Sequence, residues 1–257
     1  MIIDTHTHYL DGNWLCAAKG GLPIEDMVRT QQELGVSEMW ISSTGALADD
    51  FEFYNKNMYE KTKGYEKNFR KFATASMYYQ KKALNNIRKC IEDYGFWGIK
   101  VHFWMQGGSV QMKATHELME MSIEYKMPVL FHDGTPPASD SLQIGYLADL
   151  YPEAKIILGH SGMFDTPKSA VEMCNTHKNV YLCISCSTLN DAQMIVCNAK
   201  QDRLLFGSDY GAAESRDVLT DRIDIIEEAC KDKKLKQSIF AKNANALLQE
   251  LGAVETL

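Results

Sequence analysis

Short apolar runs alternate along the chain with longer segments in which apolar residues recur at helical spacing. A strand-like run returns about every 25 to 35 residues and a helix-like pattern follows it, which indicates βα units and a parallel sheet. The predicted strands are Met1–Thr7, Glu38–Ser42, Lys71–Met77, Gly98–Val101, Val129–Phe131, Lys155–Leu158, Val180–Ile184 and Leu204–Phe206. The predicted helices are Ile24–Leu34, Phe51–Thr62, Ala83–Tyr94, Ala114–Tyr125, Leu142–Tyr151, Pro167–Cys174, Asp191–Asn198, Asp217–Ala229 and Asn243–Leu251.

Eight strands with helical segments after them fit a chain of 257 residues that folds as a (β/α)8 TIM barrel of the α/β class. The alternative is an open doubly wound sheet, which usually has fewer strands. Such a sheet often carries a Gly-rich phosphate loop after its first strand, and no such loop follows the first apolar run. No linker or shift in composition marks a boundary, so we expect residues 1–257 to form a single domain.

Side chains able to bind a metal follow four of the apolar runs. His6 and His8 lie two residues apart on the first strand, so both point to the same side of it. The others are His132, His160 and Asp209, each at the end of a later run. Since the carboxyl ends of barrel strands meet at one rim, we expect all five to converge at a catalytic site.

Strand parity indicates which residues face the barrel interior. On the fourth strand Ile99 and Val101 suit the helix side, which leaves Lys100 and His102 facing inward. The same alternation on the first strand places Asp4 inward with the two histidines. Because a buried ammonium needs a counter-charge, we expect an ion pair between Lys100 and Asp4.

The chain resembles the amidohydrolase-2 group of the amidohydrolase superfamily, which contains both decarboxylases and a lactonase. The matching motifs span the chain in order: Asp4-Thr5-His6-Thr7-His8, Gly98-Ile99-Lys100-Val101-His102, Pro128-Val129-Leu130-Phe131-His132, Leu158-Gly159-His160-Ser161-Gly162 and Phe206-Gly207-Ser208-Asp209-Tyr210. The resemblance implies a metal-dependent hydrolase type of barrel. It also implies that His6, His8, His132 and Asp209 bind one divalent metal, most often zinc.

The resemblance further implies that His160 stands beside the metal as a catalytic residue or as a ligand of a second ion. The resemblance also gives Lys100 a second interpretation. In some branches of the amidohydrolase superfamily an inward lysine on strand four is carboxylated and bridges two metals. Neutral imidazoles with a carboxylate suit zinc, and zinc lowers the pKa of bound water toward about 7. Asp209 could take the proton of that water, so we assign catalytic roles to Asp209 and His160.

The leading hypothesis is a hydrolase that uses zinc-activated water to attack a lactone, ester or amide carbonyl of a small carboxylate or cyclic substrate. The alternative is a non-oxidative carboxy-lyase acting on an aromatic or unsaturated acid at the same metal site. Two weaker hypotheses come from other classes. A PHP-type phosphoesterase usually carries more histidines and acids than this chain. A non-catalytic relative would be expected to have lost some of the five candidate ligands, and all five are present.

Four further residues could touch the substrate. His102 follows strand four at the rim, and Trp104 lies in the next loop with other aromatic residues that could wall a pocket for a planar substrate. Tyr210 adjoins Asp209, and Arg216 could clamp a substrate carboxylate. For two of these residues an interpretation without substrate is equally good. His102 could simply begin a solvated loop, and Arg216 could be a surface charge in the first turn of a helix.

The charge and the cysteine content of the chain indicate which binding partners and which cellular compartment to expect. The formal net charge is -7 and no Lys/Arg cluster occurs, which argues against nucleic acid and anionic membranes. The seven cysteines are scattered, as expected of reduced thiols in a cytoplasmic protein, and Cys183 and Cys186 have opposite strand parity and should not hold one ion together. We expect a small-molecule substrate and, by analogy with other barrels, a possible homodimer.

Overall fold

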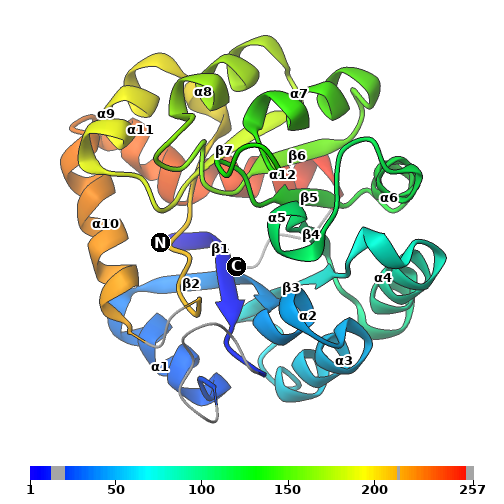
Figure 1. Ribbon diagram of the computed structural model, residues 1–257. Helices are drawn as coiled ribbons and strands as arrows, with labels where there is room; N and C mark the ends of the chain where they lie inside the picture. The colour runs from blue at the N-terminus through cyan, green and yellow to red at the C-terminus, as the bar shows by residue number, and fades with distance from the viewer. Residues whose placement is uncertain (13–20, 213–214, 253–257) are drawn as a thin grey trace.

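The computed structural model describes residues 1–12, 21–212 and 215–252. Eight strands form one parallel sheet in which each strand pairs with the next along the chain, from β1 to β8. The strands occupy the centre and helices surround them (Figure 1). They are β1 (Ile2–Tyr9), β2 (Val36–Ser43), β3 (Phe69–Thr74), β4 (Gly98–Val101), β5 (Pro128–Phe131), β6 (Lys155–Leu158), β7 (Val180–Ile184) and β8 (Leu204–Phe206). This consecutive order confirms the predicted TIM barrel and excludes the doubly wound sheet.

Helices follow each strand along the described chain and cover the outside of the barrel. The longer ones are α1 (Ile24–Leu34), α3 (Phe51–Lys61), α4 (Lys81–Tyr94), α6 (Lys113–Glu124), α7 (Ser141–Leu150), α8 (Pro167–Thr176), α9 (Leu189–Asn198), α10 (Asp217–Ala229) and α12 (Asn243–Glu250). Shorter segments are α2 (Thr44–Ala48), α5 (Phe103–Gln106), α11 (Lys233–Gln237), the 3-10 turns η1 (Met77–Tyr79) and η2 (Gln201–Arg203), and a π-helical turn η3 (Ser238–Lys242).

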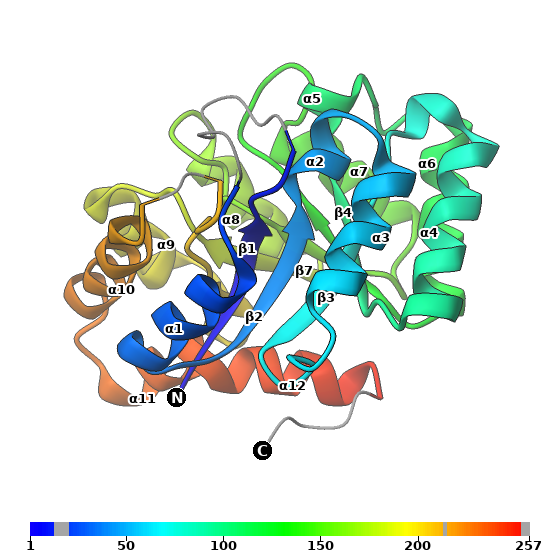
Figure 2. The same ribbon diagram turned by 90° about the horizontal axis from the view of Figure 1, so that it is seen from below.

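Strand side chains divide between two apolar clusters, as alternation on a barrel strand requires. Trp40, Phe72, Leu130 and Ile157 belong to an inner cluster that also contains Leu247 of α12. Figure 2 shows α12 lying across the end of the barrel where the strands begin. The alternate strand residues pack in the outer cluster against the helices. The end of the barrel where the strands begin is therefore filled largely by apolar side chains, although Glu38 and Arg70 form a largely buried ion pair there.

The structure differs from the predicted elements mainly in short segments. The third strand was expected at Lys71–Met77 but runs from Phe69 to Thr74, because Met77 already begins the 3-10 turn η1. The helices α2 and α5 were not predicted, since four or five residues are too few for a periodic pattern. Both are stabilised by side-chain caps: Ser43 accepts from the backbone N–H of Ala46, and His102 accepts from that of Met105.

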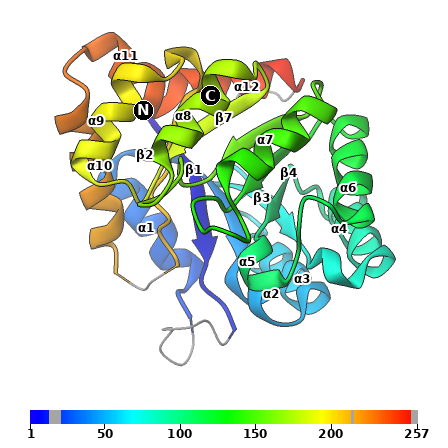
Figure 3. The same ribbon diagram turned by 45° about the horizontal axis from the view of Figure 1, so that its top comes forward.

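The first and last strands meet at the rim. The backbone N–H of Asp209 donates to the carbonyl of His6 at 2.8 Å, and that of His8 donates to the carbonyl of Tyr210 at 2.7 Å. The register of β1 against β2 shifts between Asp4 and Thr7, so β1 carries an irregularity beside the first histidine. The short helices α2 and α5 lie beside each other near the end of β1 (Figure 3).

Candidate metal centre

The two histidines of β1 present their Nε2 atoms to the same carboxylate. Asp209 Oδ1 lies 3.4 Å from His6 Nε2 and 3.1 Å from His8 Nε2. The second nitrogen of each ring has its own partner: His6 Nδ1 donates to the carbonyl of Gly159 at 2.8 Å, and His8 Nδ1 lies 3.1 Å from the hydroxyl of Ser42. Such bonds fix the orientation of each ring, an arrangement typical of metal-binding histidines.

Asp209 is held beside these rings by an uncommon backbone conformation. Its φ of +62° is left-handed, a region that aspartate tolerates better than most residues. Burial alone would raise the pKa of the Asp209 carboxyl, but the hydrogen bond from His8 and the positive charge of Lys100 hold that pKa below its ordinary value. The carboxyl group is therefore an ionised, acceptor-only ligand at neutral pH.

A chain of hydrogen bonds joins the ends of β5, β6 and β7. Ser185 Oγ donates to the carbonyl of Gly159 at 2.7 Å, so it accepts from His160 Nδ1, which lies 2.9 Å away. His160 Nε2 is then an acceptor for His132 Nδ1, at 2.9 Å. The proton count leaves a lone pair on His132 Nε2. This buried atom has no hydrogen-bond partner among residues 1–12, 21–212 and 215–252.

Three imidazoles of the site are neutral at physiological pH. Burial, supported by the neighbouring positive charges, lowers the pKa of His6 and of His160 well below the ordinary value. Burial and then Lys100 lower the pKa of His132 to about 3. Neutral imidazole is the form that binds a metal ion, so these rings need not lose a proton before they act as ligands.

The expected ion pair between Lys100 and Asp4 is wrong. Lys100 Nζ donates instead to His6 Nε2 at 2.7 Å, and burial lowers the pKa of this lysine to about 8. Asp4 accepts from the backbone N–H of Ser208 at 3.0 Å and from its hydroxyl, and burial raises the pKa of Asp4 to about 7. The shifted register of β1 breaks the strict alternation on which the prediction rested.

Two residues that strand parity did not single out also belong to the site. Asp133 is fully buried and accepts from the backbone N–H groups of His160 and Gly162, each at 2.7 Å. Cys186 Sγ lies 3.6 Å from Asp209 Oδ2. Asp133 adjoins His132, and that adjacency was the only signal in the sequence.

A family model described as amidohydrolase, the Amidohydro_2 model, matches residues 3–249. The match includes residues of all eight strands and all five candidate ligands. The chain belongs to this amidohydrolase family. The family is metal-dependent, which agrees with the polar cluster at the rim. Among curated proteins, no sequence matches the chain.

Solved structures of similar shape confirm the barrel of this amidohydrolase. A protein from Acinetobacter baumannii, called a probable 2-pyrone-4,6-dicarboxylic acid hydrolase and solved with citric acid bound, has a TM-score of 0.74 at 15% identity, covering 96% of this chain and 99% of that one. A dihydroxybenzoic acid decarboxylase from Polaromonas sp. JS666, with manganese and 2-nitroresorcinol bound, has a TM-score of 0.71 at 19% identity, covering 100% and 98%.

A 4-oxalomesaconate hydratase from Rhodopseudomonas palustris has a TM-score of 0.69 at 18% identity, covering 98% of this chain and 97% of that one. The three relatives therefore carry three different reactions on one architecture. At such low identity the likeness shows the fold alone, and the reaction has to be argued from the site.

The donor set of the amidohydrolase fits a divalent cation. With bonds of about 2.1 Å, nitrogen and oxygen ligands of one tetrahedral zinc lie about 3.4 Å apart. The observed separations of Asp209 Oδ1 from His6 Nε2 and His8 Nε2 are 3.4 and 3.1 Å. His132 lies outside this compact group, but its unpartnered Nε2 is a lone pair that a cation can use. An ion on His6 Nε2 would have to displace Lys100 Nζ.

Of the four residues suggested for substrate binding, two lie near the centre. The rings of His102 and His132 stack at 3.8 Å between centroids with an interplanar angle of 11°. Trp104 is exposed and lies 6.2 Å from His132 at 20°. The flat faces of these side chains follow one another along the rim above β4 and β5.

The other two side chains are directed toward α1. The hydroxyl of Tyr210 lies 3.3 Å from that of Thr30, and Arg216 forms an exposed ion pair with Glu33. The structure does not bring Arg216 or Tyr210 to the carboxylate and imidazoles of the centre. Contacts with α1 therefore explain where both side chains lie. Arg216, at the start of α10, is a surface charge.

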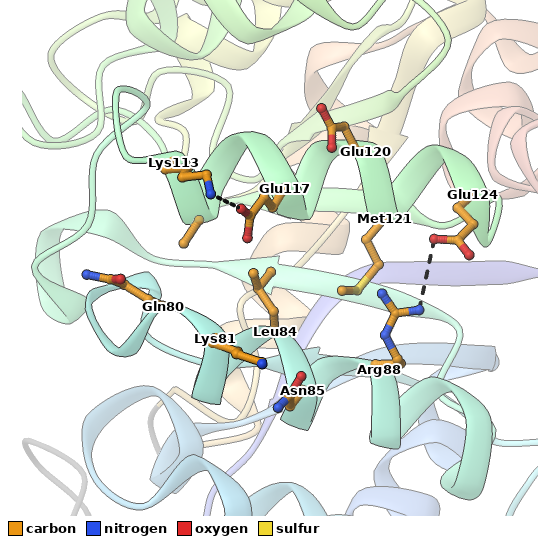
Figure 4. Close-up of a pocket in the computed structure, with 11 residues that line it drawn as sticks. Gln80, Lys81, Leu84, Asn85, Arg88, Lys113, Glu117, Glu120, Met121 and Glu124 are labelled. Atoms are coloured by element: carbon orange, nitrogen blue, oxygen red, sulfur yellow. Dashed lines mark ion pairs between the residues drawn. The ribbon is translucent and has the colours of Figure 1, made fainter.

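A separate groove of the described surface lies between α4 and α6 (Figure 4). Its charges largely face one another: Lys113 pairs with Glu117 at 3.0 Å, and Arg88 lies 4.0 Å from Glu124. The groove contains none of the candidate ligands, so the candidate catalytic site is the one at the rim. Within the described residues, no helix is long and apolar enough to cross a membrane.

Proposed function

We propose that this amidohydrolase is a metal-dependent hydrolase that cleaves a lactone, ester or amide bond of a small carboxylate or cyclic substrate. The observation that carries the proposal is the convergence of His6 Nε2 and His8 Nε2 on one oxygen of Asp209, with both rings oriented through their other nitrogen. A group built in this way supports binding of a cation at the C-terminal rim, where barrel enzymes carry their active sites.

His6, His8 and Asp209 would hold the cation, and His132 would add its free Nε2 as a fourth ligand. Three nitrogen ligands and one carboxylate suit one Zn²⁺ ion, although manganese in the related decarboxylase marks a second candidate. When bound, the cation supplies a Lewis acid for the substrate carbonyl and lowers the pKa of water.

The residues of the chain would manage the protons. As the oxygen of water bonds to the carbonyl carbon, its proton passes to the Asp209 carboxylate, and the leaving oxygen or nitrogen takes up a proton when its bond to carbon breaks. His160 would exchange protons with the substrate through Nε2. Its ring centroid lies 4.7 Å from that of His6, a proximity that supports this role.

Ser185 allows His160 to hold its proton at either nitrogen. The Ser185 hydroxyl lies 2.7 Å from the carbonyl of Gly159 and 2.9 Å from His160 Nδ1. Rotation of this hydroxyl changes it from an acceptor to a donor toward Nδ1, so Nε2 can serve as base or as acid. His102 and Trp104 supply flat faces beside His132, which favours a planar or cyclic substrate.

The same residues support a non-oxidative carboxy-lyase equally well. In that reaction the bond between the substrate carbon and its carboxyl group breaks, CO2 leaves, and His160 or Asp209 delivers a proton to the carbon. The specific observation in its favour is the similar barrel of the dihydroxybenzoic acid decarboxylase, which holds a planar phenolic inhibitor.

One assay separates the two reactions. Zinc-loaded protein is incubated with lactones, cyclic amides and aromatic carboxylic acids, and acid production and CO2 release are followed separately. Acid production without CO2 is expected, whereas CO2 release without consumption of water would establish the carboxy-lyase. His6→Ala or Asp209→Ala should abolish turnover, while His116→Ala, which removes a histidine of α6 bound to Tyr151, should not. No turnover of any substrate by the zinc-loaded protein would count against both reactions.

A further inference from the structure

The two oxygens of Asp209 face different groups. Oδ1 lies within 3.4 Å of Nε2 of both His6 and His8, whereas Oδ2 faces Cys186 Sγ at 3.6 Å. A carboxylate that offers one oxygen to each of two donor groups has the geometry of a bridge between two cations. The position assigned above uses only one of these oxygens.

Cys186 reaches this place because the backbone turns after β7. Ser185 contacts His160 from the barrel interior, so strict alternation would send the next side chain toward the helices. Instead Cys186 adopts a left-handed φ of +52°. A cysteine rarely takes this conformation, which returns its sulfur to Asp209.

Ligand atoms of His160, Cys186 and Asp209 all lie within 4.8 Å of one another, and the residues come from the ends of β6, β7 and β8. Sulfur and oxygen ligands of one tetrahedral zinc lie about 3.6 Å apart, given bonds of about 2.3 and 2.1 Å. The observed distance from Cys186 Sγ to Asp209 Oδ2 is 3.6 Å. This group is distinct from that of His6 and His8 and shares only Asp209 with it.

We propose that His160, Cys186 and Asp209 form a second divalent-cation position, with Cys186 as a thiolate ligand and Asp209 as the bridge to the first. Binding there releases the thiol proton to solvent, and His160 Nε2 exchanges its hydrogen bond with His132 for the ion. The proton exchange proposed above for His160 therefore belongs to the form that carries only the first ion. A sulfur ligand selects thiophilic ions such as Zn²⁺ or Cd²⁺ over Mn²⁺. Lys100 has no part in this position, which differs from a bridge made by a carboxylated lysine.

The inference rests on the first position of the proposed function, and the test therefore reports on both. Cys16 and Cys197 are first replaced by serine, so that these two thiols cannot contribute. The protein is stripped of metal and titrated with Cd²⁺, and bound cadmium per chain is measured together with the ultraviolet absorption of the cadmium–sulfur bond. We expect two cadmium ions per chain and one cadmium–thiolate band.

Cys186→Ser should lose the band and one of the two ions, and His160→Gln should lose the same ion without removal of any thiol. Mn²⁺ should fill only one position. A band that persists in Cys186→Ser, or a single cadmium ion in the parent protein, would overturn the second position. Failure to bind any cadmium, in contrast, would count against the proposed function itself.

Discussion

Asp133 Oδ1 accepts the backbone N–H of His160 at 2.7 Å, which ties the end of β5 to the end of β6. The other oxygen, Oδ2, accepts the N–H of Gly162 at 2.7 Å and the hydroxyl of Ser141 at 3.0 Å. One buried carboxyl group thus fixes both sides of the turn that carries His160. Since His132 directly precedes Asp133 in the chain, the same contacts couple the positions of the two histidines.

Replacing Asp133 by alanine should therefore lower both stability and turnover. The change leaves the N–H groups of His160 and Gly162 unpaired in a buried place, at a cost of about 1–3 kcal/mol for each. A displaced catalytic side chain can cost about 100-fold in rate. Urea unfolding at fixed pH and kcat/KM with the substrate found in the assay above would measure the two effects.

Ser141→Ala is the matched control, since it removes one hydrogen bond to Asp133 and leaves both backbone contacts. It should cost about 1 kcal/mol and keep kcat/KM close to that of the parent protein. If Asp133→Ala reduced kcat/KM no more than Ser141→Ala, the carboxyl group would hold the fold together without positioning His160.

The barrel and the main site residues could be predicted because they depend on simple periodicity. Apolar runs marked the strands, and the last inward residue of several runs carried an imidazole or a carboxylate. In a parallel barrel such residues must meet at one rim, wherever the loops go. Hence His6, His8 and Asp209 could be brought together without knowledge of any contact.

The remaining features depend on departures from that periodicity. The shifted register of β1 separated Asp4 from Lys100, and the left-handed φ of Cys186 returned a side chain that alternation directs outward. Asp133 acts on the site by accepting hydrogen bonds from backbone N–H groups. Every residue except proline carries such a group, so the sequence gives no sign of these contacts. Arg216 has a partner, Glu33, that only the packing of α10 against α1 could reveal.

Ser42→Ala should weaken metal binding without changing the fold. The Ser42 hydroxyl lies 3.1 Å from His8 Nδ1 and orients the ring whose Nε2 faces the cation position. Loss of such a supporting contact typically reduces metal affinity by about 10–100-fold. Competition with a chromophoric chelator gives the Kd for zinc. Ser37→Ala, at the other end of β2, should leave that Kd unchanged, and equal Kd values for both variants would refute the role of Ser42.

Zinc should raise the Tm of protein that has been stripped of metal, because an ion that binds the native state alone stabilises it. At a free zinc concentration of about 100 times Kd the gain is about 2.7 kcal/mol, or about 5–10 °C for a chain of this size. His8→Ala should lose the part of the shift that comes from the position at His6, His8 and Asp209, and His116→Ala should retain the full shift. A shift of equal size in His8→Ala would place the bound zinc elsewhere on the protein.

Lys100→Met should strengthen the binding of zinc. The Lys100 ammonium donates to His6 Nε2 at 2.7 Å, so an incoming ion has to displace a positive charge from its own ligand. Methionine retains most of the buried volume and removes the charge. We expect a lower Kd for zinc and an unchanged number of ions per chain. If Lys100 were carboxylated and bridged two ions, Lys100→Met would instead lose one ion, and bicarbonate would increase the metal content of the parent protein alone. Elemental analysis of both proteins, with and without bicarbonate, distinguishes a lysine that competes with the cation from one that binds it.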